Sequence, residues 1–237
     1  MKKENFMAGK YINILLAGLL TLFLSACSDD RDSLSVQAGG DPLLTFNMTR
    51  AGGNIVSNTL VYLFDGQGSA PLTEFDVATP DTVFGKSKLA GENFVRELNP
   101  KHLIVRSSWV YAREGSCFVN SVIRQAKEGG VIRVAAEQYS SPTSAKMLAD
   151  FIMKMIDANE YGIYHASCEG CCSRVEAAEE ILRLMGQDPT GRIEAVPSES
   201  GKNSPRNTFL RNLMMEVTGI YRMPWWQDAM KEYIQEL

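Results

Sequence analysis

The sequence predicts an α/β protein with a largely parallel sheet, preceded by a short β-rich N-terminal segment. From Leu72 onward, apolar runs of strand length alternate with amphipathic runs of helix length, the order typical of βα units. Before Leu72 the chain carries two short β-prone runs, at 43–48 and 59–64. The length of 237 residues allows one large domain or two small ones.

The elements after Leu72 follow from periodicity and helix-start signals. At 145–157 the apolar residues form one broad helical stripe, and Pro142-Thr143-Ser144 opens this helix. Ser173 and Glu176 have the capping-box spacing, which predicts a helix that ends near Gly186. The remaining predictions are helices at 83–98, 118–128, 208–217 and 225–236, and strands at 102–106, 131–135, 161–166 and 193–196.

Composition excludes nucleic acid as a partner. The chain is 45% hydrophobic and 22% charged, with a net charge of −4. A nucleic-acid-binding domain carries a basic patch or stripe, commonly interleaved with aromatic residues, and this sequence has neither.

The first 27 residues have the features of an export signal. A basic start (Lys2, Lys3 and Lys10) precedes an apolar run from Tyr11 to Leu24. This run is shorter than the roughly 20 residues that a membrane span needs. Leu24-Ser25-Ala26-Cys27 resembles the bacterial lipobox, in which the cysteine thiol accepts a lipid, and the resemblance implies a membrane contact through Cys27 and a cell-envelope location. The alternative is a buried core helix.

Residues 28–42 are polar and rich in Gly and Asp, so we interpret them as a tether. The stretch 43–70, with its two β-prone runs and the turn at Asp65–Gly68, follows. The pattern of residues 58–68 resembles the first strands of fimbrial anchor lipoproteins, and that resemblance covers about residues 1–69. A β-sandwich needs about seven strands, so such a module would be incomplete here.

The cysteines beyond Cys27 suggest packing rather than chemistry. Cys168, Cys171 and Cys172 have a spacing that also occurs in metal and redox sites. A zinc site needs four ligands, whereas the chain has only two histidines, so no metal is expected. A disulfide remains an alternative, and buried thiols are favoured.

Five motifs between Leu72 and Leu237 occur in order, at 83–92, 105–111, 137–143, 162–165 and 204–210. Together they resemble dTDP-4-dehydrorhamnose reductase, an extended short-chain dehydrogenase/reductase. The resemblance implies a partial Rossmann-type NAD(P)-binding fold with a sugar-nucleotide-binding C-terminal subdomain, so that 71–237 forms the substrate-binding part. It also implies NADPH as cofactor, a dTDP-sugar as substrate and a cytoplasmic location.

The family's catalytic pair is a tyrosine and, four residues later, a lysine. Residues at i and i+4 lie on one helix face, so the lysine can lower the pKa of the tyrosine that donates a proton. Lys88 matches the lysine, which also holds the cofactor ribose, whereas Phe84 stands at the tyrosine position. Phenylalanine has no transferable proton, which predicts severe impairment. The alternative for Lys88 is a solvated helix lysine.

The resemblance assigns substrate contacts to Trp109, Gln138 and Thr143, and, at a displaced position, to Arg206. Two of them have a plain structural alternative: Trp109 as a core aromatic at a strand end, and Thr143 as part of a helix start. Cys117 stands where the family has an amide-bearing residue near the sugar. Trp225 and Trp226 favour helix packing over a sugar platform.

No glycine-rich turn of the dinucleotide-binding type occurs in these 237 residues. The sequence therefore predicts that the fold lacks its first half, that NADPH binding is impaired and that the chain does not turn over a ketosugar. Alternative functions are a non-enzymatic envelope lipoprotein related to fimbrial anchor subunits, or the product of a fused gene. A reductase-like binding subunit, similar to the regulatory beta subunit of methionine adenosyltransferase, would need a complete Rossmann half and ranks last.

Overall fold

A computed structural model describes residues 48–49, 55–60, 70–80, 82–197 and 207–237. It confirms the α/β class and the largely parallel sheet, since parallel strand pairs alternate with helices along the chain. The elements are β1 (Met48–Thr49), β2 (Ile55–Leu60), α2 (Val83–Leu98), β3 (His102–Ser107), β4 (Val110–Tyr111), α3 (Phe118–Glu128), β5 (Ile132–Ala135), β6 (Tyr139–Ser140), β7 (Thr143–Ser144), α4 (Ala145–Asp157), β8 (Gly162–His165), β9 (Cys172–Ser173), α5 (Arg174–Leu184), β10 (Ile193–Val196), α6 (Leu213–Thr218) and α7 (Trp226–Gln235).

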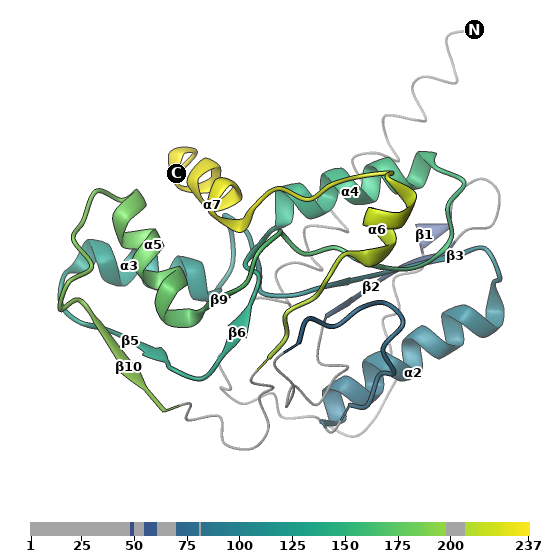
Figure 1. Ribbon diagram of the computed structural model, residues 1–237, viewed down its shortest axis with the longest axis horizontal. Helices are drawn as coiled ribbons and strands as arrows, with labels where there is room; N and C mark the ends of the chain where they lie inside the picture. Colours follow the sequence, from purple (N-terminus) through teal and green to yellow (C-terminus); the bar gives the residue numbers. More distant parts are fainter. Residues whose placement is uncertain (1–47, 50–54, 61–69, 81, 198–206) are drawn as a thin grey trace, which may run out of the picture.

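The largest sheet has the strand order β1-β2-β3-β8, and β2, β3 and β8 are parallel. The side chains from Leu103 to Ser107 in β3 are all buried, as expected for a central parallel strand covered on both faces. Helices α2 and α4 provide this cover from opposite sides of the sheet (Figure 1). Because the helix between two parallel strands runs back along the sheet, the N-terminus of α2 lies toward the edge where β2 and β3 end.

The N-terminal strand prediction needs correction. β2 begins at Ile55, four residues before the expected run 59–64, of which residues 61–64 lie outside the described ranges; of the run 43–48 only Met48 lies inside them. Local β propensity did not reveal this placement, because the register is set by pairing with a distant strand: Ile55 lies opposite His102. The same parallel pairing makes β2 part of the reductase-like sheet, although it lies before the boundary expected near residue 71.

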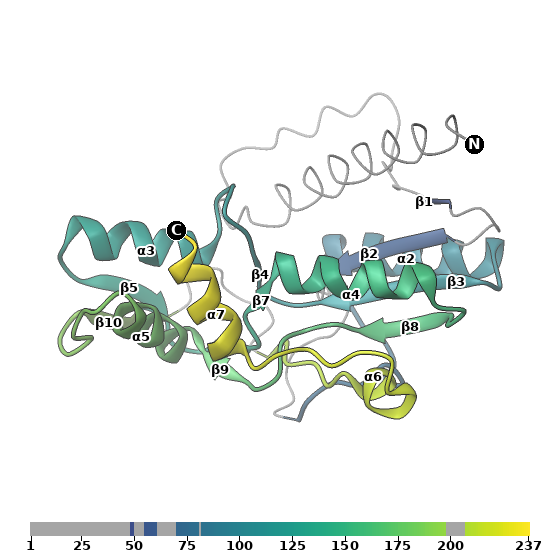
Figure 2. The ribbon, with the colours of Figure 1, turned by 90° about the horizontal axis from the view of Figure 1, so that it is seen from above.

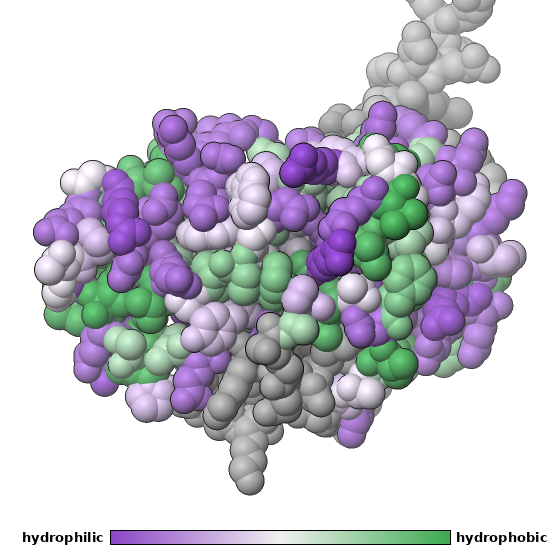
Figure 3. Space-filling model, viewed as in Figure 1, coloured by the Kyte–Doolittle hydropathy of each residue, from purple (hydrophilic) through white to green (hydrophobic). Residues whose placement is uncertain are grey.

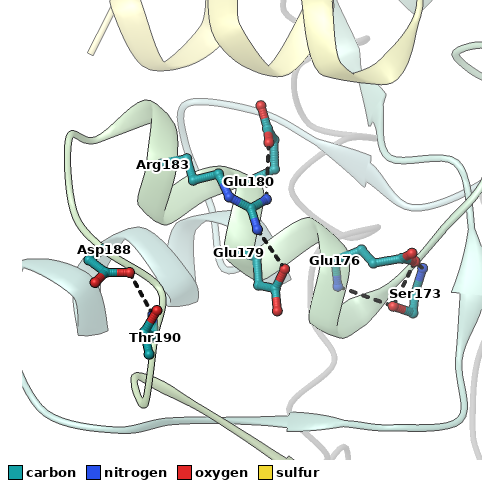
Figure 4. A network of polar contacts seen from close by, with 7 residues as sticks. All are labelled: Ser173, Glu176, Glu179, Glu180, Arg183, Asp188 and Thr190. Atoms are coloured by element: carbon teal, nitrogen blue, oxygen red, sulfur yellow. Dashed lines mark hydrogen bonds and ion pairs between the residues drawn. The ribbon is translucent and has the colours of Figure 1, made fainter.

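The other half of the molecule is built on the parallel pair β5–β10, with α3 and α5 packed beside it (Figure 1). Helix α5 begins with the predicted capping box: Ser173 Oγ accepts from the Glu176 amide at 3.1 Å, and Glu176 Oε2 accepts from the Ser173 amide at 2.7 Å. Figure 4 shows this cap and, on the exposed side of α5, Arg183 reaching back to Glu179 and Glu180. The capping box fixes where α5 begins.

Helix α7 joins the two halves. It contacts α5 on one side and β7 on the other, and its buried face includes Trp226, Met230 and Tyr233. Burial of Trp226 confirms helix packing for this residue, while Trp225 stays half exposed. At the surface, Lys146 Nζ at the start of α4 lies 2.6 Å from Glu232 of α7 and 2.7 Å from Glu236, the residue that follows this helix.

The helix predicted at 208–217 begins five residues late, at Leu213. The preceding residues pair with distant segments instead: Asn207 bridges to Tyr139 and Leu210 bridges to Leu72. Asn212 is the N-cap residue of α6, but its side chain makes no capping hydrogen bond. Its Oδ1 accepts from the Ser167 amide at 3.0 Å and its Nδ2 donates to the Ser167 carbonyl at 2.7 Å. Tertiary hydrogen bonds therefore override the local helical pattern here.

The segment that begins at Leu72 is integrated into the fold. Glu74 is buried, and its Oε1 accepts hydrogen bonds from the His165 amide at 2.9 Å and the Met214 amide at 3.1 Å. The Leu72 carbonyl lies 3.1 Å from His165 Nδ1. Viewed from above, α6 lies beside β8 (Figure 2), and Glu74 is bonded to a residue of each. Residues 72–74 thus hold the end of the largest sheet to the C-terminal segment.

The surface is mixed in character. In the space-filling view, apolar residues gather on both halves of the visible face, and hydrophilic residues cover most of its upper and outer parts (Figure 3). No helix in the described ranges combines the length and apolar character that a membrane crossing requires.

Candidate functional site

The candidate site lies where β3 ends and the chain passes into β4. In an open parallel sheet, ligands bind at the carboxyl ends of the strands, and Trp109 stands just past that end of β3. Trp109 has φ of 42°, a left-handed conformation that bulky side chains rarely adopt. Its carbonyl accepts a hydrogen bond from the Thr143 amide at 3.1 Å, beside the β4–β7 pair. This bond holds the main chain of Trp109 in the left-handed conformation.

Thr143, predicted to contact substrate, is fully buried. Its hydroxyl accepts from the Cys168 amide at 3.2 Å and donates to the Ser141 carbonyl at 3.1 Å. The hydroxyl therefore ties β7 to the segment after β8, and its amide fixes Trp109.

Arg174, the first residue of α5, connects Trp109 with Gln138. Its guanidinium carbon lies 4.2 Å from the centre of the Trp109 ring and 4.3 Å from that of Phe118. Its Nε donates to Gln138 Oε1 at 3.1 Å, and its amide donates to the Gln138 carbonyl at 3.2 Å. Trp109, Gln138 and Thr143, which lie apart in the sequence, are thus brought into one cluster by contacts of Arg174 and of the Thr143 amide.

Sequence reasoning missed Arg174 and Phe118. Arg174 was noted only within the capping-box pattern, which predicts a helix start and carries no information about a cation. Phe118 opens α3, and the sequence places it only in that helix and in the family motif at 115–119, with no contact of its own. The signal that would have found Arg174 is spatial, because Trp109 precedes it by 65 residues in the chain.

The candidate catalytic pair lies on the first two turns of α2. Phe84 is 44% exposed, and Lys88 Nζ lies 5.2 Å from the centre of its ring. This contact is a cation–π arrangement, and a benzyl ring contains no proton to transfer. About one turn beyond Lys88, Glu92 is bonded to Arg106 of β3, which anchors the helix to the sheet.

Arg206 and Cys27 lie outside the described residues. The residues directly after position 206 approach the cluster: the Thr208 amide donates to the Tyr139 carbonyl at 2.9 Å. Ser108 Oγ donates to Thr208 Oγ1 at 3.0 Å, and Ser140 Oγ donates to Ser108 Oγ at 2.6 Å. This chain of buried hydroxyls holds the C-terminal segment beside the residues that flank Trp109 and Gln138.

The four described cysteines are free thiols, and three of them are buried. Burial raises the pKa of the Cys168 thiol to about 12, and burial with the nearby Glu176 raises that of Cys171 to about 11. At neutral pH both are therefore protonated and weakly nucleophilic. Within the described ranges no three His, Cys, Asp or Glu side chains gather as metal ligands would.

The described residues lack the features that bind the pyrophosphate of NADPH. A pyrophosphate is held by a glycine-rich turn that leads into a helix N-terminus, with backbone amides directed at the phosphates. The described helices begin instead after Thr82, Cys117, Ser144, Ser173, Asn212 and Trp225, none of them in such a turn. Lys88 alone matches a cofactor contact, so these residues do not form a dinucleotide cradle.

A parallel sheet with helices on both faces, and a residue cluster at its carboxyl edge, define a Rossmann-like α/β protein. A dTDP-glucose 4,6-dehydratase from Bacillus anthracis shares this fold at a TM-score of 0.67 and only 15% identity. The chain belongs to the RmlD substrate binding domain family, whose model matches residues 15–237. The match begins well before Leu72, where the reductase resemblance was expected to begin. It includes the 28–69 stretch interpreted as tether and fimbrial-type segment.

Two relatives and two structures show the extent of the similarity. A spore coat polysaccharide biosynthesis protein of Bacillus subtilis (strain 168) is 36% identical over 79% of this chain and 66% of its own length. The dTDP-4-dehydrorhamnose reductase of Escherichia coli (strain K12) is 32% identical over 74% of this chain and 63% of its own. The chain therefore spans just under two thirds of the length of these curated relatives.

Among solved structures, a dTDP-4-dehydrorhamnose reductase from Clostridium acetobutylicum superposes with a TM-score of 0.72 at 39% identity. The superposed region covers 78% of this chain and 66% of the Clostridium acetobutylicum chain. A dTDP-4-dehydrorhamnose reductase from Bacillus anthracis, solved in complex with NADP, gives the same TM-score and coverage at 34% identity.

Proposed function

We propose that this chain carries the sugar-nucleotide-binding part of a dTDP-4-dehydrorhamnose reductase, binds a dTDP-sugar and does not reduce it. The observation that carries the proposal is the cluster at the end of β3, where Trp109 and Gln138 lie against one guanidinium. These two residues match the family's substrate-binding motifs. Phe84 stands beside Lys88 at the position of the proton donor.

The proposed lack of turnover follows from the chemistry of ketone reduction. The carbonyl carbon must receive a hydride while the oxygen receives a proton. NADPH supplies the hydride in the reductase family, and the described residues do not provide its cradle. Phe84 cannot supply the proton, and loss of a general acid typically costs about 10² to 10⁴ in rate. Two deficits therefore act on the same step.

The test has a binding arm and a turnover arm. Calorimetric titration with dTDP-L-rhamnose should show saturable binding by the full chain, while NADPH oxidation with dTDP-4-dehydrorhamnose should not exceed the enzyme-free rate. Phe84→Tyr should leave turnover absent, because the described residues still provide no cofactor cradle. The Bacillus anthracis reductase serves as the positive control. Turnover by the unaltered chain would overturn the proposed inactivity, and absence of binding would overturn the binding role.

A second candidate role, an envelope lipoprotein, is favoured by the Leu24-Ser25-Ala26-Cys27 sequence. In this role Cys27 carries acyl chains, each buried methylene contributing about 0.8 kcal/mol to membrane affinity, and the sugar-nucleotide site faces a compartment poor in NADPH. Labelled palmitate should be incorporated in cells that express the chain, and Cys27→Ser should abolish the labelling. Unlabelled protein in the soluble fraction would exclude this role.

A further inference from the structure

The guanidinium of Arg174 occupies a corner formed by two aromatic rings. The ring centres of Trp109 and Phe118 are 6.4 Å apart and the rings are inclined by 45°, whereas the guanidinium carbon is 4.2 and 4.3 Å from them. The ring-to-ring distance is shorter than the two cation distances laid end to end, so the rings form a corner and not a parallel sandwich. A planar cation seated in such a corner restrains both rings at once.

The same guanidinium fixes which way the Gln138 amide faces. Arginine has donors and no acceptor, so the Gln138 atom at 3.1 Å from Arg174 Nε must be the oxygen. The amide NH₂ group then points to the other side of the side chain. The backbone bond from the Arg174 amide to the Gln138 carbonyl holds the two residues in register. Arg174 thereby makes Gln138 a hydrogen-bond donor toward anything that approaches its free side.

The Trp109 backbone gives an independent reason to look for a function here. Its φ of 42° is unfavourable for a bulky residue, a conformation that typically costs about 1–3 kcal/mol and occurs most often at functional sites. The Thr143 amide holds the backbone in this state, and Arg174 holds the ring. Main chain and side chain are therefore restrained separately.

We propose that Arg174 is a positioning residue of the sugar-nucleotide site: it holds the Trp109 ring and orients the Gln138 amide so that its NH₂ group donates to an oxygen of the ligand. This inference rests on the proposed binding function. It adds that the contact at Gln138 is made by a donor, and that an acceptor at this position is excluded.

The first experiment measures dTDP-L-rhamnose affinity in Arg174 variants of the full chain. Arg174→Met keeps much of the length of the side chain but removes the donors and the charge. It should raise the Kd for dTDP-L-rhamnose by roughly 3- to 10-fold, the effect of one hydrogen bond. Arg174→Lys keeps the charge without the planar fork, and should be weakened similarly. Arg174→Ala should regain affinity when millimolar guanidinium is added, a rescue that a general loss of structure would not show.

Gln138→Glu provides a second test with opposite effects on stability and binding. A carboxylate at this position pairs with Arg174 through a charge-assisted bond, which should raise the melting temperature. It has no NH₂ group and should therefore lose affinity for dTDP-L-rhamnose. Affinity equal to that of the unaltered chain would overturn the assignment of Gln138 as a donor.

Arg183→Met is the matched control, since Arg183 lies on the same helix, is exposed and pairs only with Glu179 and Glu180 among the contacts described. It should leave Kd unchanged. If the unaltered chain fails to bind dTDP-L-rhamnose, the proposed function falls and this inference falls with it. If the unaltered chain binds and Arg174→Met binds equally well, only the positioning role of Arg174 is overturned.

Discussion

Glu92 of α2 and Arg106 of β3 form a buried two-point ion pair. Arg106 Nη2 lies 2.7 Å from Glu92 Oε2, and Nε donates to Oε1 at 2.9 Å. The side chains are 1% and 4% exposed, respectively. The pair fastens the helix that carries Phe84 and Lys88 to the central strand that leads to Trp109. It links the two groups of residues that the family resemblance selected.

Removing one partner of this pair should destabilise the fold strongly. Glu92→Gln leaves the Arg106 charge buried without its counter-charge, and breaking a buried pair in this way typically costs about 3–5 kcal/mol. The measurement is urea unfolding followed by circular dichroism. The double variant Glu92→Leu/Arg106→Met should recover much of the loss, because it leaves no buried charge. A single variant as stable as the unaltered chain would contradict this account.

The exposed pair Arg211–Glu216 provides the control for that prediction. Arg211 Nη2 lies 2.7 Å from Glu216, a distance equal to the buried one, but both side chains are about half exposed. Water and salt screen such a pair. Arg211→Gln should therefore leave the unfolding midpoint nearly unchanged, which would show that burial, and not distance, determines the effect.

His165 should make the protein less stable in acid. Its burial, together with the nearby Arg106 charge, lowers its pKa from 6.5 to about 3. Between pH 6.5 and 3 the His165 imidazole is protonated in the unfolded chain but stays neutral in the folded protein. The free energy of unfolding therefore falls as the pH drops from 6.5 toward 3. Above pH 6.5 His165 is neutral in both states, and this loss of stability is absent. His165→Asn does not titrate in this range and should show a flatter dependence.

Unfolding curves in urea at intervals between pH 7 and pH 4 provide the measurement. Asp76, whose pKa is lowered by bonds from Thr73, and Glu74, whose pKa is raised by burial, titrate in both proteins. The difference between His165→Asn and the unaltered chain therefore reports the histidine together with its charge coupling to Asp76. Parallel curves for the two proteins would show that His165 does not cause the acid sensitivity.

Gly170 should not tolerate a side chain. Its φ is +85°, and an added Cβ would lie 2.9 Å from two ring atoms of Trp225. The left-handed conformation alone costs roughly 1–2 kcal/mol for a residue with a Cβ, so Gly170→Ala should lower the melting temperature. Gly91→Ala in α2 meets nothing within 4 Å and should stabilise the protein by about 0.5–1 kcal/mol. Equal effects of the two changes would refute the argument.

Cys168 and Cys172 should resist alkylation in the folded protein. Both are buried, and burial is the largest cause of their raised pKa values. Cys171 is exposed, but its pKa of about 11 keeps little thiolate at neutral pH, so it should react slowly and faster as pH rises. Iodoacetamide labelling followed by mass spectrometry measures each site. Rapid labelling of Cys168 without denaturant would contradict the packing.

Much of the fold after Leu72 was predictable because its signals are local. The helices expected at 118–128 and 145–157 are found at those bounds, since an amphipathic stripe repeats within the segment itself. The Ser173–Glu176 capping box is likewise formed within one turn. The start of α6 and the placement of β2 could not be predicted in this way, because both depend on hydrogen bonds to residues far away in the sequence.

The candidate site likewise contains residues that the sequence identified and one residue that only the structure revealed. Sequence motifs selected Trp109, Gln138 and Thr143, yet the local pattern around Arg174 indicated only a helix start. The structure brings Arg174 against Trp109 and Gln138, and it shows that the buried Thr143 hydroxyl accepts a hydrogen bond from the Cys168 amide. A guanidinium contact between residues 65 positions apart leaves no trace in local periodicity.

The sequence by itself determined the α/β class, most helix bounds, the family resemblance and the loss of the phenolic proton at Phe84. These properties reside in residue identity and in spacings of a few residues. Only the tertiary structure decided that β2 joins the sheet of β3, that Glu92 pairs with Arg106, and that Arg174 fixes the Gln138 amide. Such contacts arise when packing and loop closure bring distant segments together, and no short-range pattern encodes which partners will meet.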